Sequence, residues 1–87
     1  MSAALQIYYS GFDTPFFKLP PQVRSRLEAK IDEMGLRLKT FPHHRLKGHE
    51  RFRLRVSDFR IIYTFDVERN ILHLLAVGHR REIYRDY

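Results

Sequence analysis

Residues 51–66, RFRLRVSDFRIIYTFD, decide the fold of this chain. Along the first half, three arginines alternate with three apolar residues; they are Arg51, Arg53, Arg55 and Phe52, Leu54, Val56. The two-residue period is that of a strand with one charged and one apolar face. After a turn at Ser57-Asp58, the same apolar period returns at Phe59, Ile61, Tyr63 and Phe65, with Arg60 on the other face. The segment therefore predicts a β-hairpin that carries guanidinium groups on one side.

Composition favours a single small domain over residues 1–87 with a polyanionic partner. Sixteen lysines and arginines against ten acidic residues give a net charge of +6, and the sequence pI is near 10.1. Such a balance is typical of nucleic-acid-binding proteins. The absence of cysteine excludes disulfides, thiol nucleophiles and thiolate zinc sites.

Neither a membrane nor a secretory route is predicted. No apolar run approaches the roughly 20 residues that span a bilayer, and residues 1–11 lack a charged start followed by a long apolar stretch. We therefore expect a cytoplasmic location and no membrane partner.

Upstream of the hairpin, the sequence predicts a strand and two helices. Residues 5–9 are a short apolar run, Thr14-Pro15 is typical of a helix start, and Pro20-Pro21 ends that short helix. A longer helix from Gln22 to Phe41-Pro42 is predicted by one apolar stripe, which consists of Val23, Leu27, Ile31, Met34 and Leu38.

The remaining segments complete an α+β fold. Residues 43–50 are expected to form a loop, and residues 71–77 a last strand that ends at Gly78. The order β-α-α-β-β-β predicts an antiparallel sheet with the helical hairpin packed on one face. The short connections between the last three strands require those three to be antiparallel.

The arginine pattern has two interpretations. Strand charges usually form a solvated sheet face. Here five positive residues share one region, Arg51, Arg53, Arg55, Arg60 and Arg80, while only Asp58, Asp66 and Glu82 are near enough to neutralise them. Because like charges on one sheet face repel each other, an absent anion such as a phosphate is the expected counterpart.

Residues near the C-terminus add groups that could transfer protons. Tyr84 is either an aromatic residue packed on the sheet or a base, and His79 is either structural or a proton carrier beside the arginines. His43 and His44 are adjacent in the predicted loop and lack metal-ligand spacing, so we expect neither a metal nor a cofactor. Paired-carboxylate, GxSxG and HExxH patterns are absent. What remains is metal-free cleavage of RNA, in which the RNA supplies its own 2'-hydroxyl as nucleophile.

Three segments resemble the RelE/ParE superfamily of toxins from toxin-antitoxin systems. These are HRLKG at 44–48, the hairpin RFRLRVSDFRIIYTF, and VGHRREIYR at 77–85. The resemblance spans nearly the whole chain and implies a compact sheet with two helices on one face. In the RelE branch it implies a ribonuclease that enters the ribosomal A site and cuts mRNA, whereas ParE-like relatives poison DNA gyrase.

The resemblance also implies a set of site residues. The basic positions of the nuclease branch correspond to Arg51 and Arg53, Arg60 and Arg80, with the tyrosine at Tyr84. The nuclease branch has lysines where Arg51 and Arg53 stand, so these two are assigned phosphate binding rather than proton transfer. The implied catalytic set is Arg53, Arg60, Arg80, Tyr84 and His79. Further RNA contacts are assigned to Arg51, Arg55, Lys47, Arg81 and Arg85.

The resemblance leaves three functions open. The first is an mRNA endoribonuclease with the ribosome and mRNA as partners. The others are a gyrase-directed toxin and an inactive relative that only binds nucleic acid or a partner. Either toxin implies a cognate antitoxin whose acidic or amphipathic segment neutralises the basic face.

Overall fold

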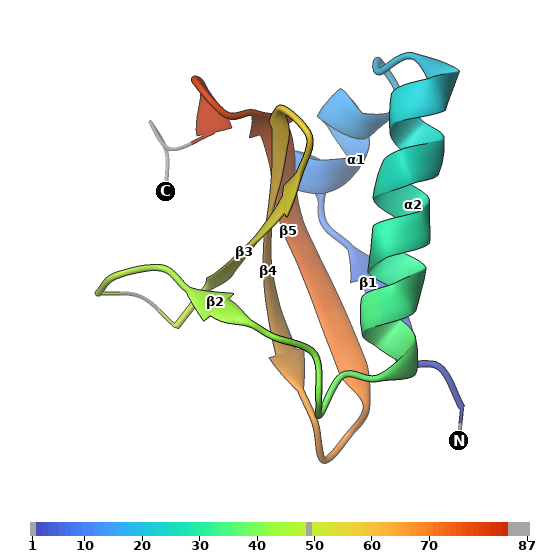
Figure 1. The fold of residues 1–87 in the computed structure, drawn as a ribbon, viewed down its shortest axis with the longest axis vertical. Coiled ribbons are helices and arrows are strands. Elements are labelled where there is room, and N and C mark those ends of the chain that lie inside the picture. Colours follow the sequence, from blue (N-terminus) through green and yellow to red (C-terminus); the bar gives the residue numbers. More distant parts are fainter. Residues whose placement is uncertain (1, 49, 84–87) are drawn as a thin grey trace.

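A computed structural model describes residues 2–48 and 50–83, and its architecture confirms the predicted α+β class (Figure 1). Along the chain the elements are β1 (Leu5–Tyr8), α1 (Ser10–Phe16), α2 (Pro21–Leu36), β2 (His44–Arg45), β3 (Phe52–Val56), β4 (Phe59–Asp66) and β5 (Ile71–His79). Both helices lie on the same side of one five-stranded sheet (Figure 1). No helix in the described part of the chain is long and apolar enough to cross a bilayer.

The strands are ordered β1-β5-β4-β3-β2 across the sheet. As predicted, β3, β4 and β5 are antiparallel neighbours. The prediction of a wholly antiparallel sheet is wrong for β1, which pairs in parallel with β5 from Leu5 opposite Ile71 to Tyr8 opposite Leu74. The two partners are separated by most of the chain, so no short connection constrains their relative direction.

The two helices form, but their boundaries differ from the prediction. Helix α1 begins at Ser10, four residues before Thr14, because the extended Tyr9 offers its carbonyl to the N–H groups of Phe12 and Asp13 at 2.9 Å. Pro15 therefore lies inside α1 rather than at its start. Helix α2 begins at Pro21, which suits the first helical position because proline lacks the N–H that would be unpaired there.

Helix α2 ends at Leu36, so the predicted apolar stripe continues past the helix. Leu38, the last stripe residue, is buried at 4 % exposure but lies in the turn that follows. The Gly35 carbonyl accepts a hydrogen bond of 2.9 Å from the Ala4 N–H, which ties the end of α2 to the segment before β1.

The main core lies between the helices and the sheet. Helix residues Leu27, Ile31 and Met34 are at most 1 % exposed, and they pack with alternate strand residues such as Leu54 and Ile61. The predicted alternation in the hairpin is thus confirmed: the apolar residues of β3 face the helices and its arginines face away.

A second, smaller cluster lies on the sheet face that points away from the helices. It consists of the buried Ile62, Ala76 and Ile83, with Leu46 and Leu75 packed against it. Since Leu46 follows β2 and Ile83 follows β5, this cluster holds two chain segments against the face that carries the arginines.

Candidate functional site

Three arginines and one histidine surround a cavity on the sheet face opposite the helices. The cavity has a volume of about 270 Å³, and its lining is His44, Arg53, Arg55 and Arg60. We call it the arginine cavity. The strand register explains its composition, because His44 pairs with Arg53 across β2–β3 and Arg55 pairs with Arg60 across β3–β4.

This arrangement concentrates positive charge. The side chains of directly opposed residues start about 5 Å apart, and like charges in that position destabilise a sheet. No acidic side chain is among the lining residues of the arginine cavity in the described part of the chain. A bound phosphate would remove this repulsion, and planar guanidinium groups suit its oxygens.

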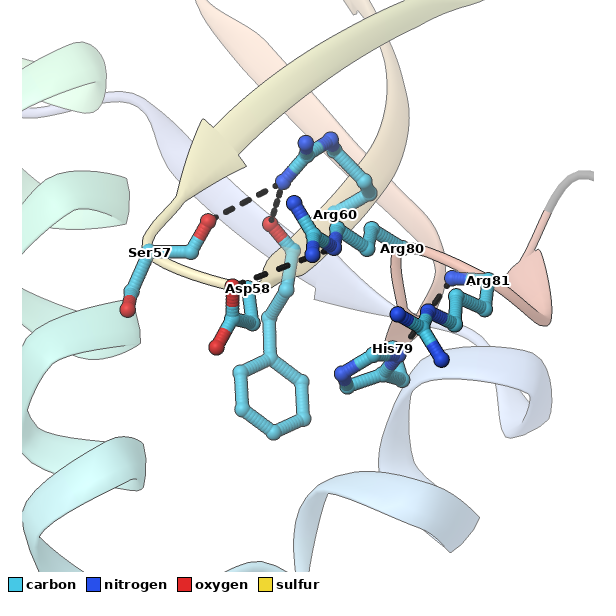
Figure 2. A network of polar contacts seen from close by, with 7 residues as sticks. Ser57, Asp58, Arg60, His79, Arg80 and Arg81 are labelled. Carbon is cyan, nitrogen blue, oxygen red and sulfur yellow. Dashed lines mark hydrogen bonds and ion pairs between the residues drawn. The ribbon is translucent and has the colours of Figure 1, made fainter.

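Arg60 is held more tightly than the other two arginines. It is 9 % exposed, and its Nη1 donates hydrogen bonds to the carbonyls of Ser57 at 3.1 Å and Phe59 at 2.9 Å (Figure 2). Ser57 lies in the tight turn between β3 and β4, and Phe59 is the first residue after this turn. The turn therefore fixes the direction of a guanidinium group that has further N–H donors for a ligand.

His44 lines the arginine cavity, although the sequence analysis did not assign it to the site. The predicted loop over 43–50 is wrong at this point, because His44 and Arg45 form the short strand β2 at the edge of the sheet. His44 and Leu46 are two residues apart, and Leu46 packs on the second cluster. This two-residue period next to an apolar residue is the signal that could have placed His44 on the arginine face.

The residue before His44 anchors this edge strand. The ring of His43 donates from Nε2 to the Leu38 carbonyl at 2.7 Å, so its Nδ1 accepts the hydrogen bond of 2.6 Å from the Tyr63 hydroxyl. His43 also stacks on Phe65 with ring centroids 3.9 Å apart. Burial raises the pKa of Tyr63 above its ordinary value, so this phenol stays protonated and serves as a donor.

Arg80 lies just beyond β5, next to the β3–β4 turn. Its backbone N–H donates to the Asp58 carbonyl at 2.8 Å, and its Nε lies 3.9 Å from Asp58 Oδ1 (Figure 2). The two side chains are 46 % and 63 % exposed, so this ion pair is weak and water screens it. Arg80 is thus near Arg60 but remains able to turn toward a ligand.

His79 does not point into the arginine cavity, contrary to the expected grouping. Strand β5 extends to His79, which pairs with Phe59, while Gly78 is the partner of Arg60. The His79 ring contacts the Phe59 ring edge-on at 5.9 Å, and its Nδ1 accepts a hydrogen bond from the Arg81 N–H at 3.3 Å. In Figure 2 the His79 ring and the Arg60 guanidinium group point away from each other.

The other residues assigned from the sequence lie around or beyond the arginine cavity. Arg51 precedes β3 and is not part of the lining, whereas Arg55, assigned only as an RNA contact, is. Lys47 and Arg81 are exposed in turns that follow β2 and β5. Tyr84 and Arg85 lie outside the described residues.

The described residues contain no group of three or more histidine or acidic side chains close enough to hold a metal ion. The groups that the arginine cavity presents are guanidinium and imidazole, which bind anions and transfer protons.

A family profile identifies the chain. Residues 12–84 match the family described as "ParE toxin of type II toxin-antitoxin system, parDE". The chain belongs to this ParE toxin family. The sequence-based identification of a RelE/ParE superfamily toxin is thereby confirmed.

Solved structures of related toxins agree with the observed fold of this ParE-family toxin. The intact Escherichia coli RelBE toxin-antitoxin complex gives a TM-score of 0.75 at 19 % identity, covering 88 % of this chain and 96 % of that one. The isolated E. coli RelE toxin gives 0.75 at 21 %, covering 97 % and 94 %. The RelB-RelE complex of Methanococcus jannaschii gives 0.70 at 24 %, covering 93 % and 98 %. No curated protein sequence matches the chain.

Proposed function

We propose that this toxin is a metal-independent endoribonuclease that cuts mRNA in the ribosomal A site. The observation that carries the proposal is the strand register, which gathers Arg53, Arg55, Arg60 and His44 around one cavity. Guanidinium groups that stabilise charge and an imidazole that transfers protons are suited to cleavage of an RNA phosphodiester when no metal takes part.

In the proposed reaction the RNA supplies its own nucleophile. The 2'-oxygen forms a bond to phosphorus as the bond from phosphorus to the 5'-oxygen breaks. One proton leaves the 2'-hydroxyl, and one is given to the departing 5'-oxygen. The products are a 2',3'-cyclic phosphate and a 5'-hydroxyl end, so atoms and charge balance without a water molecule or a metal ion.

Arg60, Arg53 and Arg55 are proposed to stabilise the negative charge that grows on the phosphate oxygens. The buried Arg60 is oriented before substrate arrives, and such preorganised donors give the largest rate effects. Arg80, beside the turn, can approach the same phosphate from the β5 side.

The two proton transfers are assigned to His44 and Tyr84. Histidine is the side chain that most often gives and takes protons near neutral pH, and His44 is the histidine that lines the arginine cavity. Tyr84 remains the proposed base for the 2'-hydroxyl, with His44 as the donor to the 5'-oxygen. In this proposal His44 replaces His79 as the proton donor, because the His79 ring contacts Phe59 and is not among the lining residues of the arginine cavity.

The proposal includes partners. The related RelE toxins were solved in complex with RelB antitoxins, and we infer that a cognate antitoxin binds this chain as well. A ribosomal target also implies a cytoplasmic location.

Primer extension on a defined mRNA in a purified translation system tests the proposal. We expect ribosome-dependent cuts with wild-type protein, and strong loss with Arg60→Ala, His44→Asn and Tyr84→Phe. Arg69→Ala is the matched control, because Arg69 is 80 % exposed in the β4–β5 turn and pairs there with Asp66 at 3.7 Å. Intact mRNA with wild-type protein, or equal loss in the control, would refute the assignment.

A second candidate function is inhibition of DNA gyrase. It is favoured by one specific finding, the match of residues 12–84 to the ParE toxin family. This function predicts loss of supercoiling activity when purified gyrase is incubated with the toxin, without cuts in translated mRNA. The two assays in parallel separate the candidates.

A further inference from the structure

A groove on the helical side of the molecule has a chemistry opposite to that of the arginine cavity. Four aromatic rings that contact one another in series line this groove. Tyr8 contacts Phe12 at 5.4 Å, Phe12 stacks on Phe16 at 5.1 Å, and Phe16 meets Phe17 edge-on at 5.4 Å between centroids. The middle two are buried, while Tyr8 is 44 % and Phe17 67 % exposed. The series runs from β1 along α1, and α2 forms the opposite wall.

The groove is open and has room for part of a partner. Its volume is about 380 Å³, which is at the small end of the range of about 300–1,000 Å³ for ligand pockets. It can therefore take a few side chains of a partner segment rather than the surface of a folded domain. Phe17 at its rim is 67 % exposed, so its ring is accessible to a side chain that enters the groove.

Negatively charged residues line the groove together with the aromatic rings. The remaining lining residues are Ile31 and three acidic residues, Asp13 on α1 and Glu28 and Asp32 on α2. Asp32 accepts a hydrogen bond of 2.9 Å from Gln6, which in turn accepts one from the Tyr8 hydroxyl. Asp13 and Glu28 form no ion pair with any residue in the described part of the chain.

The electrostatics of Tyr8 agree with this geometry. Partial burial raises its pKa above the ordinary value, and the charges of Asp32, Glu28 and Asp13 raise it further. In a chain of net charge +6, the groove is thus a local negative region. It lies on the helical side of the sheet, whereas the arginine cavity faces the opposite side.

We propose that the groove binds a segment of a partner protein that inserts a lysine or arginine flanked by apolar side chains. The long stems of these residues pack on aromatic rings while their charged ends reach carboxylates. Phe17 and Tyr8 offer the rings, and Glu28 and Asp13 offer the carboxylates.

The same features reject other occupants. Three carboxylates repel the phosphates of RNA, so the groove is not an extension of the arginine cavity. They also repel an acidic segment of the kind expected to neutralise the arginines. The segment that binds here must therefore differ in charge from one that covers the opposite face.

The test uses two short amphipathic peptides with the full-length toxin. One peptide combines leucine and lysine, and the other has glutamate in place of every lysine. Aromatic NMR spectra follow the rings of Tyr8 and Phe17 during titration. We expect the lysine peptide to shift these resonances and the glutamate peptide to leave them unchanged. Glu28→Lys should weaken binding of the lysine peptide about tenfold.

Glu33→Lys is the matched control for this charge reversal. Glu33 is also on α2, but it pairs with Lys30 at 3.3 Å and faces a different depression next to Val56. Equal weakening by the two variants, equal shifts by both peptides, or no shift of either ring would overturn the proposal. Self-association of the toxin that a Phe17→Ser change abolishes would overturn it too, since a second copy would then be the occupant. Circular dichroism of each variant checks that it is folded.

Discussion

The hydrogen bond between Tyr63 and His43 leads to our first prediction. The difference in unfolding free energy between the wild-type protein and Tyr63→Phe should change sign as the pH rises. Tyr63 is fully buried and donates to His43 Nδ1 at 2.6 Å. Tyr63→Phe removes this donor and leaves the ring nitrogen of a half-buried histidine unsatisfied. The expected loss at pH 7 is about 1–2 kcal/mol in the free energy of unfolding. In a domain of this size each kcal/mol lowers the melting temperature by roughly 4–8 °C.

At high pH the wild-type protein should lose this advantage. Because burial raises the pKa of Tyr63 above its ordinary 10.0, the unfolded chain releases the phenolic proton at a lower pH than the folded chain. The stabilisation is therefore complete below about pH 10 and falls above it by up to about 1.4 kcal/mol per pH unit. Phenylalanine does not titrate, so for a deficit of about 1–2 kcal/mol the two stability curves should cross between about pH 10.6 and 11.5. Tyr8, whose pKa is also raised, is present in both proteins and cancels in the difference.

Urea unfolding of both proteins at a series of pH values measures this difference. Tyr9→Phe is the matched control, because Tyr9 also contacts a histidine, His73 Nδ1 at 3.1 Å, but is 44 % exposed. Water can replace that bond, so its loss at pH 7 should be only a few tenths of a kcal/mol. A Tyr63→Phe deficit that is the same at pH 8 and pH 11.5 would refute the reasoning.

Three further predictions concern the arginine cavity and its turn. Arg60→Ala should slow mRNA cleavage about 100- to 1,000-fold, which is the effect of removing one preorganised donor. Primer extension over time measures the rate, and circular dichroism checks that the variant is folded. Arg53→Gln should reduce the slope of log affinity against log salt for single-stranded RNA by about 0.7, the value for one phosphate contact, whereas Arg69→Gln should leave it unchanged. Ser57→Gly should raise the free energy of unfolding by about 0.5 kcal/mol, because Ser57 has a left-handed backbone with φ 55°. Glycine relieves about 1–2 kcal/mol of strain there, which exceeds its entropic cost of about 0.5–1 kcal/mol. A loss of stability in urea unfolding would contradict that last prediction.

The hairpin is predictable from the sequence because its signals are local. Alternation of charged and apolar residues fixes which face each side chain takes, and Ser57-Asp58 marks the turn between the strands. The same alternation is enough to assign Arg53, Arg55 and Arg60 to one face. It does not say which of Arg51 and Arg55 lines the arginine cavity, because β3 starts at Phe52 and its pairing with β2 depends on distant residues.

The wrong predictions concern features that local patterns do not encode. The predicted start of helix α1 is too late because Tyr9 caps the helix through its backbone, without a capping side-chain hydrogen bond, whereas Thr14-Pro15 is a stronger but misleading start signal. Strand β2 has only two residues, so the spacing of His44 and Leu46 is a single repeat of the strand period and too weak a signal to predict the strand. Strand β5 continues to His79, two residues past the predicted strand, and the His79 ring contacts Phe59; sequence adjacency to Arg80 does not reveal this contact. Tyr84 and Arg85 lie outside the described residues, so their roles stay predictions.

The position of the arginine cavity follows from the core rather than from attraction among its own residues. Left alone, Arg55 and Arg60 would repel each other across the β3–β4 pair, at a cost of up to about 1 kcal/mol. Slipping the register by one residue would separate them, but it would also turn Leu54 and Val56 outward and the arginines into the core. Each of those apolar residues contributes about 1.5–3 kcal/mol when buried, so the core outweighs the repulsion. The fold therefore places three arginines around one cavity in the absence of a ligand, and an anion that binds there would find Arg60 already oriented.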